Sequence, residues 1–163
     1  MDMNLSEEGL VFLKKKEGVR NRVYDDGAGY PTVGVGHKLI GQELEQYKLG
    51  SFVPDCQVDA WLRQDVEFAV RCVNNWVVVS LSQTGFDMLV SFVFNVGCEA
   101  FKKSTLLRQL NRGQIKEASE EFKKWVFSNK KRMAGLVARR AEEAETFLKS
   151  ELERPPDHAG IPS

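Results

Sequence analysis

The sequence has 163 residues, of which 42% are hydrophobic and 28% are charged. This composition excludes a disordered chain and a fibrous repeat, and the length predicts one domain with its own hydrophobic core. The formal net charge is zero, but residues 100–140 carry twelve Lys and Arg against three Glu, a local balance of +9. Such a basic segment suits a polyanion such as a bacterial cell wall, a nucleic acid or an anionic membrane, although a solvated helical face gives the same pattern.

The three cysteines, Cys56, Cys72 and Cys98, have no CxxC spacing and no histidines clustered near them, which argues against a structural zinc site. We expect free, mostly packed thiols in a chain made in a reducing compartment. The N-terminal residues are acidic first and basic later, the reverse of a signal peptide, and no stretch approaches the ~18 apolar residues of a membrane span. We therefore expect synthesis in the cytoplasm without a signal peptide, and no stable insertion in a membrane.

The first predicted element is a helix over residues 5–16, which Asn4 or Ser6 can cap. Gly18 stops this helix and leaves Glu17 in its last turn. At that end the negative pole of the helix dipole disfavours an ionised carboxylate, which suits a group that donates a proton.

A glycine-rich stretch follows, and residues 23–39 show the pattern of short strands. Pro31 removes one hydrogen-bond donor, so we expect an irregular sheet of two or three strands. Residues 41–47 are predicted to form a short helix, and residues 50–54 form a connector.

The rest of the chain is predicted to be helical. A long helix is expected to begin at Asp55, and a segment over residues 86–96, which begins near its cap Ser82, is apolar on every side and is therefore expected to be buried. Residues 128–132 are predicted to form a polar, basic loop. The remaining predicted helices cover residues 104–110, 115–126 and 136–152.

These elements predict an α+β fold that is mostly helical. We expect a single domain over residues 1–153 and a flexible tail over residues 154–163. Within the domain the expected parts are a β-containing lobe (17–54), a connecting helix (55–76), and a helical lobe (77–153) that packs with the first helix (5–16).

Glu17, Asp26 and Thr32 are the first candidates for chemistry. Hydrolysis of a glycosidic bond usually needs one carboxylic acid to protonate the leaving oxygen and one carboxylate that acts at the anomeric centre or activates water. A Glu at a helix end, an Asp in the following turn and a nearby hydroxyl could supply these groups. Because acidic residues are common on every protein surface, these three residues alone are better explained by a solvated surface than by a catalytic site.

The spacing of these residues resembles the catalytic stretch of the phage-type lysozymes, or endolysins (glycoside hydrolase family 24). Eight residues separate Glu17 from Asp26, five more lead to Thr32, and Gly34-Val35-Gly36-His37 follows. Further motifs resemble the family in the same order, so the likeness covers about residues 5–150. They are Gln64-Asp65-Val66, Phe92-Val93-Phe94-Asn95-Val96-Gly97, Ser104-Thr105-Leu106-Leu107, Trp125, and Gly135-Leu136-Val137-Ala138-Arg139-Arg140 with Glu143.

The resemblance implies a role for each matching residue. Glu17 is implied as general acid, Asp26 as the carboxylate that orients or activates water, and Thr32 as a partner for that water. The spacing favours Asp26 over its neighbour Asp25. Arg140 matches the position whose guanidinium pairs with the catalytic Glu, with Arg139 as the alternative if the register is off by one, and this pair would favour the ionised Glu and oppose the helix dipole.

Other matching residues are implied to support the site. Phe94 and Asn95 match positions that line the sugar groove, although Phe94 fits a core position equally well. His37 matches an ion-pair or hydrogen-bond partner that lies away from the chemistry. The three tryptophans are expected to be core residues rather than platforms for sugars: Trp61, Trp76 and Trp125.

The implied fold is lysozyme-like, with a small β-sheet lobe and a helical lobe joined by a long helix. The implied activity is that of a muramidase, which hydrolyses the β-1,4 bond between N-acetylmuramic acid and N-acetylglucosamine, with inversion, and lyses bacteria. No cofactor, metal or nucleic acid is expected, and the protein is expected to be a monomer that reaches the cell wall through a pore or an export system. Two alternatives are a lytic transglycosylase and a non-enzymatic basic protein that binds walls or membranes.

Residues 126–134 depart from the family pattern, because they lack the usual glycines and proline.

Overall fold

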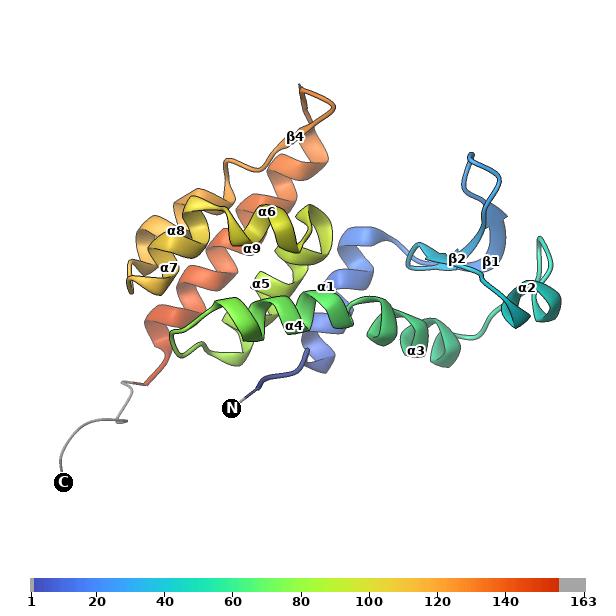
Figure 1. Cartoon of the computed structure of the whole chain (residues 1–163), viewed down its shortest axis with the longest axis horizontal. Helices are drawn as coiled ribbons and strands as arrows, with labels where there is room; N and C mark the ends of the chain where they lie inside the picture. Colours follow the sequence, from blue (N-terminus) through green and yellow to red (C-terminus); the bar gives the residue numbers. More distant parts are fainter. Residues whose placement is uncertain (1, 156–163) are drawn as a thin grey trace. The chain divides into compact units, whose positions relative to one another are not determined.

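The computed structural model describes residues 2–155, so most of the predicted tail lies outside the described residues (Figure 1). The chain divides into two compact units. Residues 7–67 form the N-terminal unit, and the described residues 2–6 and 68–155 belong to the helical unit. The predicted fold class, α+β and mostly helical, is confirmed, whereas the predicted domain organisation stays a prediction.

Helix α1 (Glu7–Glu17) opens the N-terminal unit and buries Leu10 and Leu13. It ends at Gly18, which has φ +81° and donates its N–H to the Lys14 carbonyl at 2.9 Å. Glycine is favoured there because a side chain would be strained at positive φ. The predicted position of Glu17 in the last helical turn is therefore confirmed.

The N-terminal unit contains an antiparallel sheet in the order β1 (Arg20–Asp25), β2 (Pro31–Gly34) and β3 (His37–Lys38). The β1–β2 pairing is irregular between Arg20 and Tyr24, so the expected short, irregular sheet is confirmed. The register places Thr32 opposite Tyr24 on one side and opposite Lys38 on the other. Thr32 thus occupies the central strand, next to the turn that joins β1 to β2. The other helices of this unit are α2 (Gln42–Gln46) and α3 (Asp55–Asp65).

The helix predicted from Asp55 onwards is interrupted. Helix α3 ends at Asp65, and α4 (Glu67–Trp76) begins after Val66, whose backbone angles are φ −87° and ψ −8°. Val66 is buried and its N–H still bonds to the Leu62 carbonyl at 2.9 Å. Because the break leaves the apolar periodicity almost intact, the sequence pattern could not reveal it.

Helix α5 (Gln83–Val96) is the centre of the helical unit, and its residues from Gly85 to Val93 are buried. The predicted cap is confirmed, since Ser82 Oγ accepts the Gly85 N–H at 2.9 Å. Phe92 packs edge-on against the rings of Phe122 and Trp125, at centroid distances of 5.2 and 5.6 Å. Helix α5 packs against α9, and Figure 1 shows α7 and α8 on the same bundle. The bounds are α6 (Cys98–Lys102), α7 (Thr105–Asn111), α8 (Ile115–Phe122) and α9 (Ala134–Glu153).

The predicted basic loop over residues 128–132 is a β-hairpin. Strand β4 (Phe127–Ser128) pairs with β5 (Lys131–Arg132), and Asn129 and Lys130 form the turn with φ values of 51° and 66°. A two-residue turn with both φ values positive is the connection that matches strand twist. The sequence did not reveal it because Asn-Lys lacks the glycine that marks most such turns.

The expectation of three free, packed thiols is wrong. Cys72 and Cys98 form a disulfide with a Cα–Cα distance of 5.9 Å, and the free Cys56 is exposed. The two bonded cysteines are 26 residues apart, and only the packing of α4 beside the start of α6 brings them together. The expectation of a core position is also wrong for Trp76. Its side chain is 43% exposed, and the Lys102 ammonium lies over its ring.

Candidate active site

Glu17 and Asp26 both belong to the N-terminal unit. Glu17 is the last residue of α1 and is exposed. Asp26 begins the turn between β1 and β2, directly after Asp25 at the end of β1.

The turn holds its two aspartates by backbone amides. Asp26 Oδ1 accepts the N–H groups of Ala28 and Tyr30, at 2.8 and 3.1 Å. These bonds lower the pKa of Asp26 below its ordinary value, and the charge of Lys38, whose Nζ lies 3.8 Å from Oδ2, adds to the effect. Asp26 is therefore an ionised carboxylate whose Oδ1 is fixed by the turn. Asp25 Oδ1 accepts the N–H groups of Gly27 and Gly29 instead, at 2.7 and 3.2 Å.

Thr32 is tied to Asp26 through one peptide group. The buried Thr32 donates its hydroxyl to the Tyr30 carbonyl at 2.9 Å, and the same carbonyl accepts the Asp26 N–H at 3.2 Å. Because its only hydroxyl proton is used in this bond, Thr32 Oγ1 can act towards a further molecule only as an acceptor. The structure thus links Asp26, Tyr30 and Thr32 in one hydrogen-bonded arrangement.

His37 lies between two carboxylates in the same unit. Its Nδ1 is 2.8 Å from Asp65 and its Nε2 is 3.1 Å from Glu43. The ring also stacks on Trp61, with centroids 4.4 Å apart. Both ring nitrogens are occupied, so His37 has the contacts of a structural ion-pair partner.

Arg140 is almost completely buried in the helical unit. Its Nε donates to the Trp125 carbonyl at 2.8 Å, its Nη1 to Glu143 at 2.7 Å, and its Nη2 to Asn95 Oδ1. The guanidinium also lies over the Phe92 ring, 5.0 Å from its centroid. These contacts hold the guanidinium between α5, α9 and the segment that follows α8.

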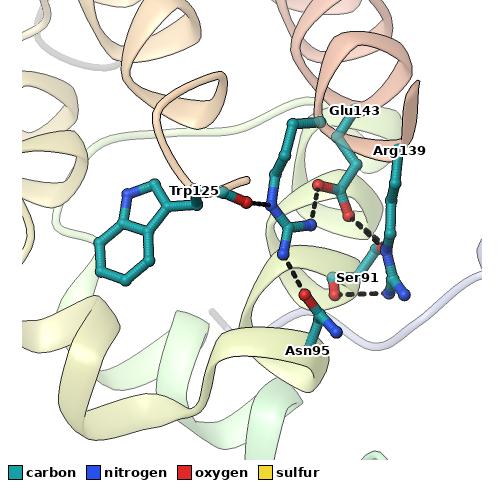
Figure 2. Close-up of polar contacts among 6 residues, drawn as sticks. Ser91, Asn95, Trp125, Arg139 and Glu143 are labelled. Carbon is teal, nitrogen blue, oxygen red and sulfur yellow. Dashed lines mark hydrogen bonds and ion pairs between the residues drawn. The ribbon is translucent and has the colours of Figure 1, made fainter. Parts of the chain in front are cut away.

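Arg139 shares the same carboxylate. Its Nη2 donates to the Ser91 carbonyl at 3.0 Å, its Nε lies 3.3 Å from Glu143 Oε2, and Ser91 Oγ donates to Glu143 at 2.6 Å (Figure 2). Glu143 has no exposed surface, and both arginines contact its carboxylate. Sequence reasoning quoted Glu143 only as part of a motif and missed Ser91 altogether. A signal for Glu143 was its spacing of three and four residues from the two arginines, which places all three on one helical face.

Asn95 and Arg140 line a cavity of about 290 Å³ in the helical unit. Trp125, which is partly buried, and Phe127 of the hairpin line it as well. Phe94 does not line this cavity, and its ring packs against Phe68 with centroids 6.1 Å apart. The structure therefore gathers Asn95, Trp125 and Arg140 at one cavity. The expected pairing of Arg140 with Glu17 stays a prediction.

Among residues 2–155, no group of three or more His, Cys, Asp and Glu side chains is arranged to hold a metal ion. No helix in this part of the chain is long and apolar enough to span a membrane.

Comparison with known proteins connects both units to one family. The phage lysozyme family model matches residues 14–143. An endolysin of Acyrthosiphon pisum secondary endosymbiont phage 1 is 37% identical over 149 residues, which cover 89% of this chain and 98% of the relative. The muramidase domain of SpmX from Asticaccaulis excentricus is 36% identical with a TM-score of 0.76, and covers 89% of this chain and 97% of its own. A mutant of P22 lysozyme is 34% identical with a TM-score of 0.81, and the match covers 90% of this chain and 99% of the P22 lysozyme chain. These matches span both units of the fold, and the chain therefore belongs to the phage lysozyme family.

Proposed function

We propose that this protein is a lysozyme that hydrolyses the β-1,4 bond between N-acetylmuramic acid and N-acetylglucosamine in peptidoglycan. Family membership supports a peptidoglycan hydrolase, and the similar muramidase domain supports this bond as the target. The observation that carries the mechanism is the Asp26 carboxylate, which two backbone amides hold in its ionised form.

In this proposal Asp26 directs the attacking water. Oδ1 is occupied by the amides of Ala28 and Tyr30, so Oδ2 is the oxygen that accepts a proton of the water. Thr32 Oγ1 accepts the second proton in a hydrogen bond, because its own proton is donated to Tyr30. With both protons held, the water directs a lone pair to the anomeric carbon. The negative charge of Asp26 also stabilises the positive charge that develops there.

Glu17 is the proposed general acid. It protonates the glycosidic oxygen, so that the leaving sugar departs as a neutral hydroxyl while water adds to the anomeric carbon. The proton from the water passes to Asp26. Attack from the face opposite the leaving group gives inversion, for which we expect the two carboxyl groups to lie about 6.5–9.5 Å apart.

The remaining site residues have supporting roles in this proposal. Arg140 adjusts the charge state of Glu17 by pairing with it, and Asn95 offers an amide to the N-acetyl group of a bound sugar. Phe94 provides apolar surface beside the sugar groove, and His37 stabilises the N-terminal unit without taking part in chemistry.

The proposal also includes the setting of the enzyme. The protein acts as a monomer on glycan strands, needs no cofactor, binds no nucleic acid and does not insert stably in a membrane. It is made in the cytoplasm and reaches the wall through a pore or an export system.

Replacing Glu17 by Gln tests the proposal. Loss of a general acid lowers kcat by about 10²–10⁴, measured as release of reducing sugar from purified cell walls. Glu8→Gln is the matched control, because Glu8 is an exposed carboxylate in the first turn of the same helix. Wild-type activity in Glu17→Gln would remove Glu17 as the acid. Mass spectrometry of the products separates hydrolysis from transglycosylation, since only the latter leaves 1,6-anhydro ends.

A further inference from the structure

Tyr30 presents an exposed aromatic ring in the turn that holds the Asp26 carboxylate. The turn between β1 and β2 otherwise contains Asp26, Ala28 and two glycines, so Tyr30 is its one large side chain. The Tyr30 side chain is 55% exposed. Because an aromatic ring gains free energy when it leaves water, an open ring beside a catalytic carboxylate is a candidate contact surface for substrate.

The backbone of Tyr30 is fixed by the residues that are proposed to hold the water. Its N–H donates to Asp26 Oδ1 at 3.1 Å, and its carbonyl accepts the Thr32 hydroxyl at 2.9 Å and the Asp26 N–H at 3.2 Å. The point from which the ring projects is therefore set by the same contacts that set Asp26 and Thr32.

Lys38 connects the ring itself to the carboxylate. Its ammonium lies over the Tyr30 ring, 4.6 Å from the centroid, and 3.8 Å from Asp26 Oδ2. Oδ2 is the oxygen assigned to the attacking water, since Oδ1 is occupied by two backbone amides. Because one ammonium group contacts both, the Tyr30 ring lies close to Oδ2.

The strand register places Lys38 on the sheet face that carries Thr32. Thr32 of β2 lies directly opposite Lys38 of β3, and directly opposite residues of an antiparallel pair project on the same face. Lys38 therefore links the Tyr30 ring to both groups that are proposed to bind the water.

The chemistry of an aromatic ring in this place suits a neutral sugar. A pyranose has a face of C–H groups that can pack on an aromatic ring while its hydroxyl groups keep their hydrogen bonds. The tyrosine side chain has only two rotatable torsions, so little conformational entropy is lost when a ligand orders it. The Lys38 contact restricts the ring further before any ligand binds.

We propose that the Tyr30 ring stacks on a sugar of the glycan strand beside the bond that is cleaved, and that Lys38 is the positioning residue that holds the ring there. This inference rests on the proposed function and adds a substrate contact to it. The contact is with a part of the sugar that does not react, so it strengthens the ground state and the transition state alike. It therefore acts on KM and leaves kcat nearly unchanged.

The test removes the Tyr30 ring and compares it with a second exposed ring of the same unit. Phe52 is 59% exposed, and the Arg22 guanidinium lies over its ring, 5.8 Å from the centroid. Phe52→Ala is therefore the matched control for Tyr30→Ala. Tyr30→Phe keeps the ring, Lys38→Met removes the charge, and Lys38→Arg keeps it. Circular dichroism and thermal unfolding establish that each variant is folded.

The substrate is soluble glycan strands that an amidase has released from purified sacculi, assayed at neutral pH, where Asp26 is ionised. We expect Tyr30→Ala to raise KM roughly tenfold with little change in kcat, and Tyr30→Phe to recover most of this loss. Lys38→Met should raise KM roughly threefold, since a cation–π contact at an exposed site is worth about that factor, and Lys38→Arg should restore it. A wild-type KM in Tyr30→Ala, or an equal rise in Phe52→Ala, would overturn the inference.

The acidic limb of the pH profile separates a substrate contact from a structural role of the ring. The Tyr30 amide helps to lower the pKa of Asp26, so a turn that loosens without the ring would move the acidic limb of kcat/KM to higher pH. We expect Tyr30→Ala to keep the limb of the wild type. A fall in kcat together with a shifted limb would show that the ring only supports the turn, and the inference would be wrong.

A binding measurement separates this inference from the proposed function. In a Glu17→Gln background, which prevents digestion, isothermal titration with the same glycan strands should give a Kd roughly tenfold higher when Tyr30→Ala is added. Equal Kd values with and without the ring would refute the inference. Absence of wild-type hydrolysis of any glycan would refute the proposed function, while the difference in Kd still reports on Tyr30.

Discussion

His37 Nδ1 lies 2.8 Å from Asp65 Oδ2, a contact that joins β3 to the last residue of α3. Glu43 of α2 approaches the other ring nitrogen at 3.1 Å. Burial by itself lowers the pKa of His37, but the hydrogen bonds and charges of Asp65 and then Glu43 raise it more, so the net pKa lies above its ordinary value. The histidine therefore connects three elements of the N-terminal unit most strongly when it is protonated.

This relationship predicts a pH dependence of stability. A group whose pKa is raised by folding contributes its full stabilisation below its unfolded pKa and loses it as the pH rises through the folded pKa. We expect the free energy of unfolding to fall as pH increases above about 6.5, and this fall to be absent in His37→Gln. Urea denaturation across this range measures it. The control is His158→Gln, which replaces the chain's other histidine. If His158→Gln abolishes the pH dependence of the free energy of unfolding and His37→Gln does not, His37 is not the source of that dependence.

Asp25 and Asp26 provide a matched pair for the carboxylate role. Each accepts two backbone N–H groups through Oδ1, so an Asn at either position can keep the turn and remove only the charge. We expect Asp26→Asn to lower kcat by about 10²–10⁴, whereas Asp25→Asn stays near the wild-type value. Because the amides of Ala28 and Tyr30 lower the pKa of Asp26, wild-type activity should persist at pH values below the ordinary aspartate range before protonation removes it. A larger loss of kcat in Asp25→Asn than in Asp26→Asn would assign the catalytic carboxylate to Asp25 instead.

Glu143 should be a major contributor to stability. It has no exposed surface and accepts bonds from Arg139, Arg140 and Ser91. Glu143→Gln would remove the charge of a buried carboxylate that both guanidinium groups contact, and we expect it to lower the free energy of unfolding by about 3–5 kcal/mol. Chemical denaturation followed by tryptophan fluorescence measures the change. Glu145→Gln, an exposed position on the same helix, should change stability by less than about 0.5 kcal/mol. Equal effects of the two variants would contradict this account.

The disulfide between Cys72 and Cys98 predicts both a thiol count and a change in stability. One thiol, that of Cys56, should react with an alkylating reagent in the native protein, and all three should react after reduction in denaturant. For a closed loop of this length the disulfide is worth roughly 3 kcal/mol. Replacing Cys72 and Cys98 together by Ala should lower the free energy of unfolding by about this amount. The same substitution at Cys56 should leave stability close to that of the wild type, and three reactive thiols in the native protein would exclude the bond.

The sequence by itself determined the elements that depend on local chemistry. Gly18 ends α1 after Glu17 because the chain continues through a positive φ. Ser82 caps α5 because its hydroxyl accepts a nearby amide. The spacing of Glu17, Asp26 and Thr32, together with the later motifs in the same order, also indicated the family, which the phage lysozyme family model confirms.

Only the tertiary structure decided the contacts between residues distant in the chain. Cys72 and Cys98 form a disulfide, and Ser91 bonds to both Arg139 and Glu143. Helix packing brings these side chains together, and their separations in sequence follow no helical or strand period that would predict the contacts. The turn at Asn129 and Lys130 became visible only through its backbone angles. The local pattern of apolar and polar residues predicts how a segment folds and which of its faces is buried. Which side chain a buried group contacts depends on the packing of the whole unit.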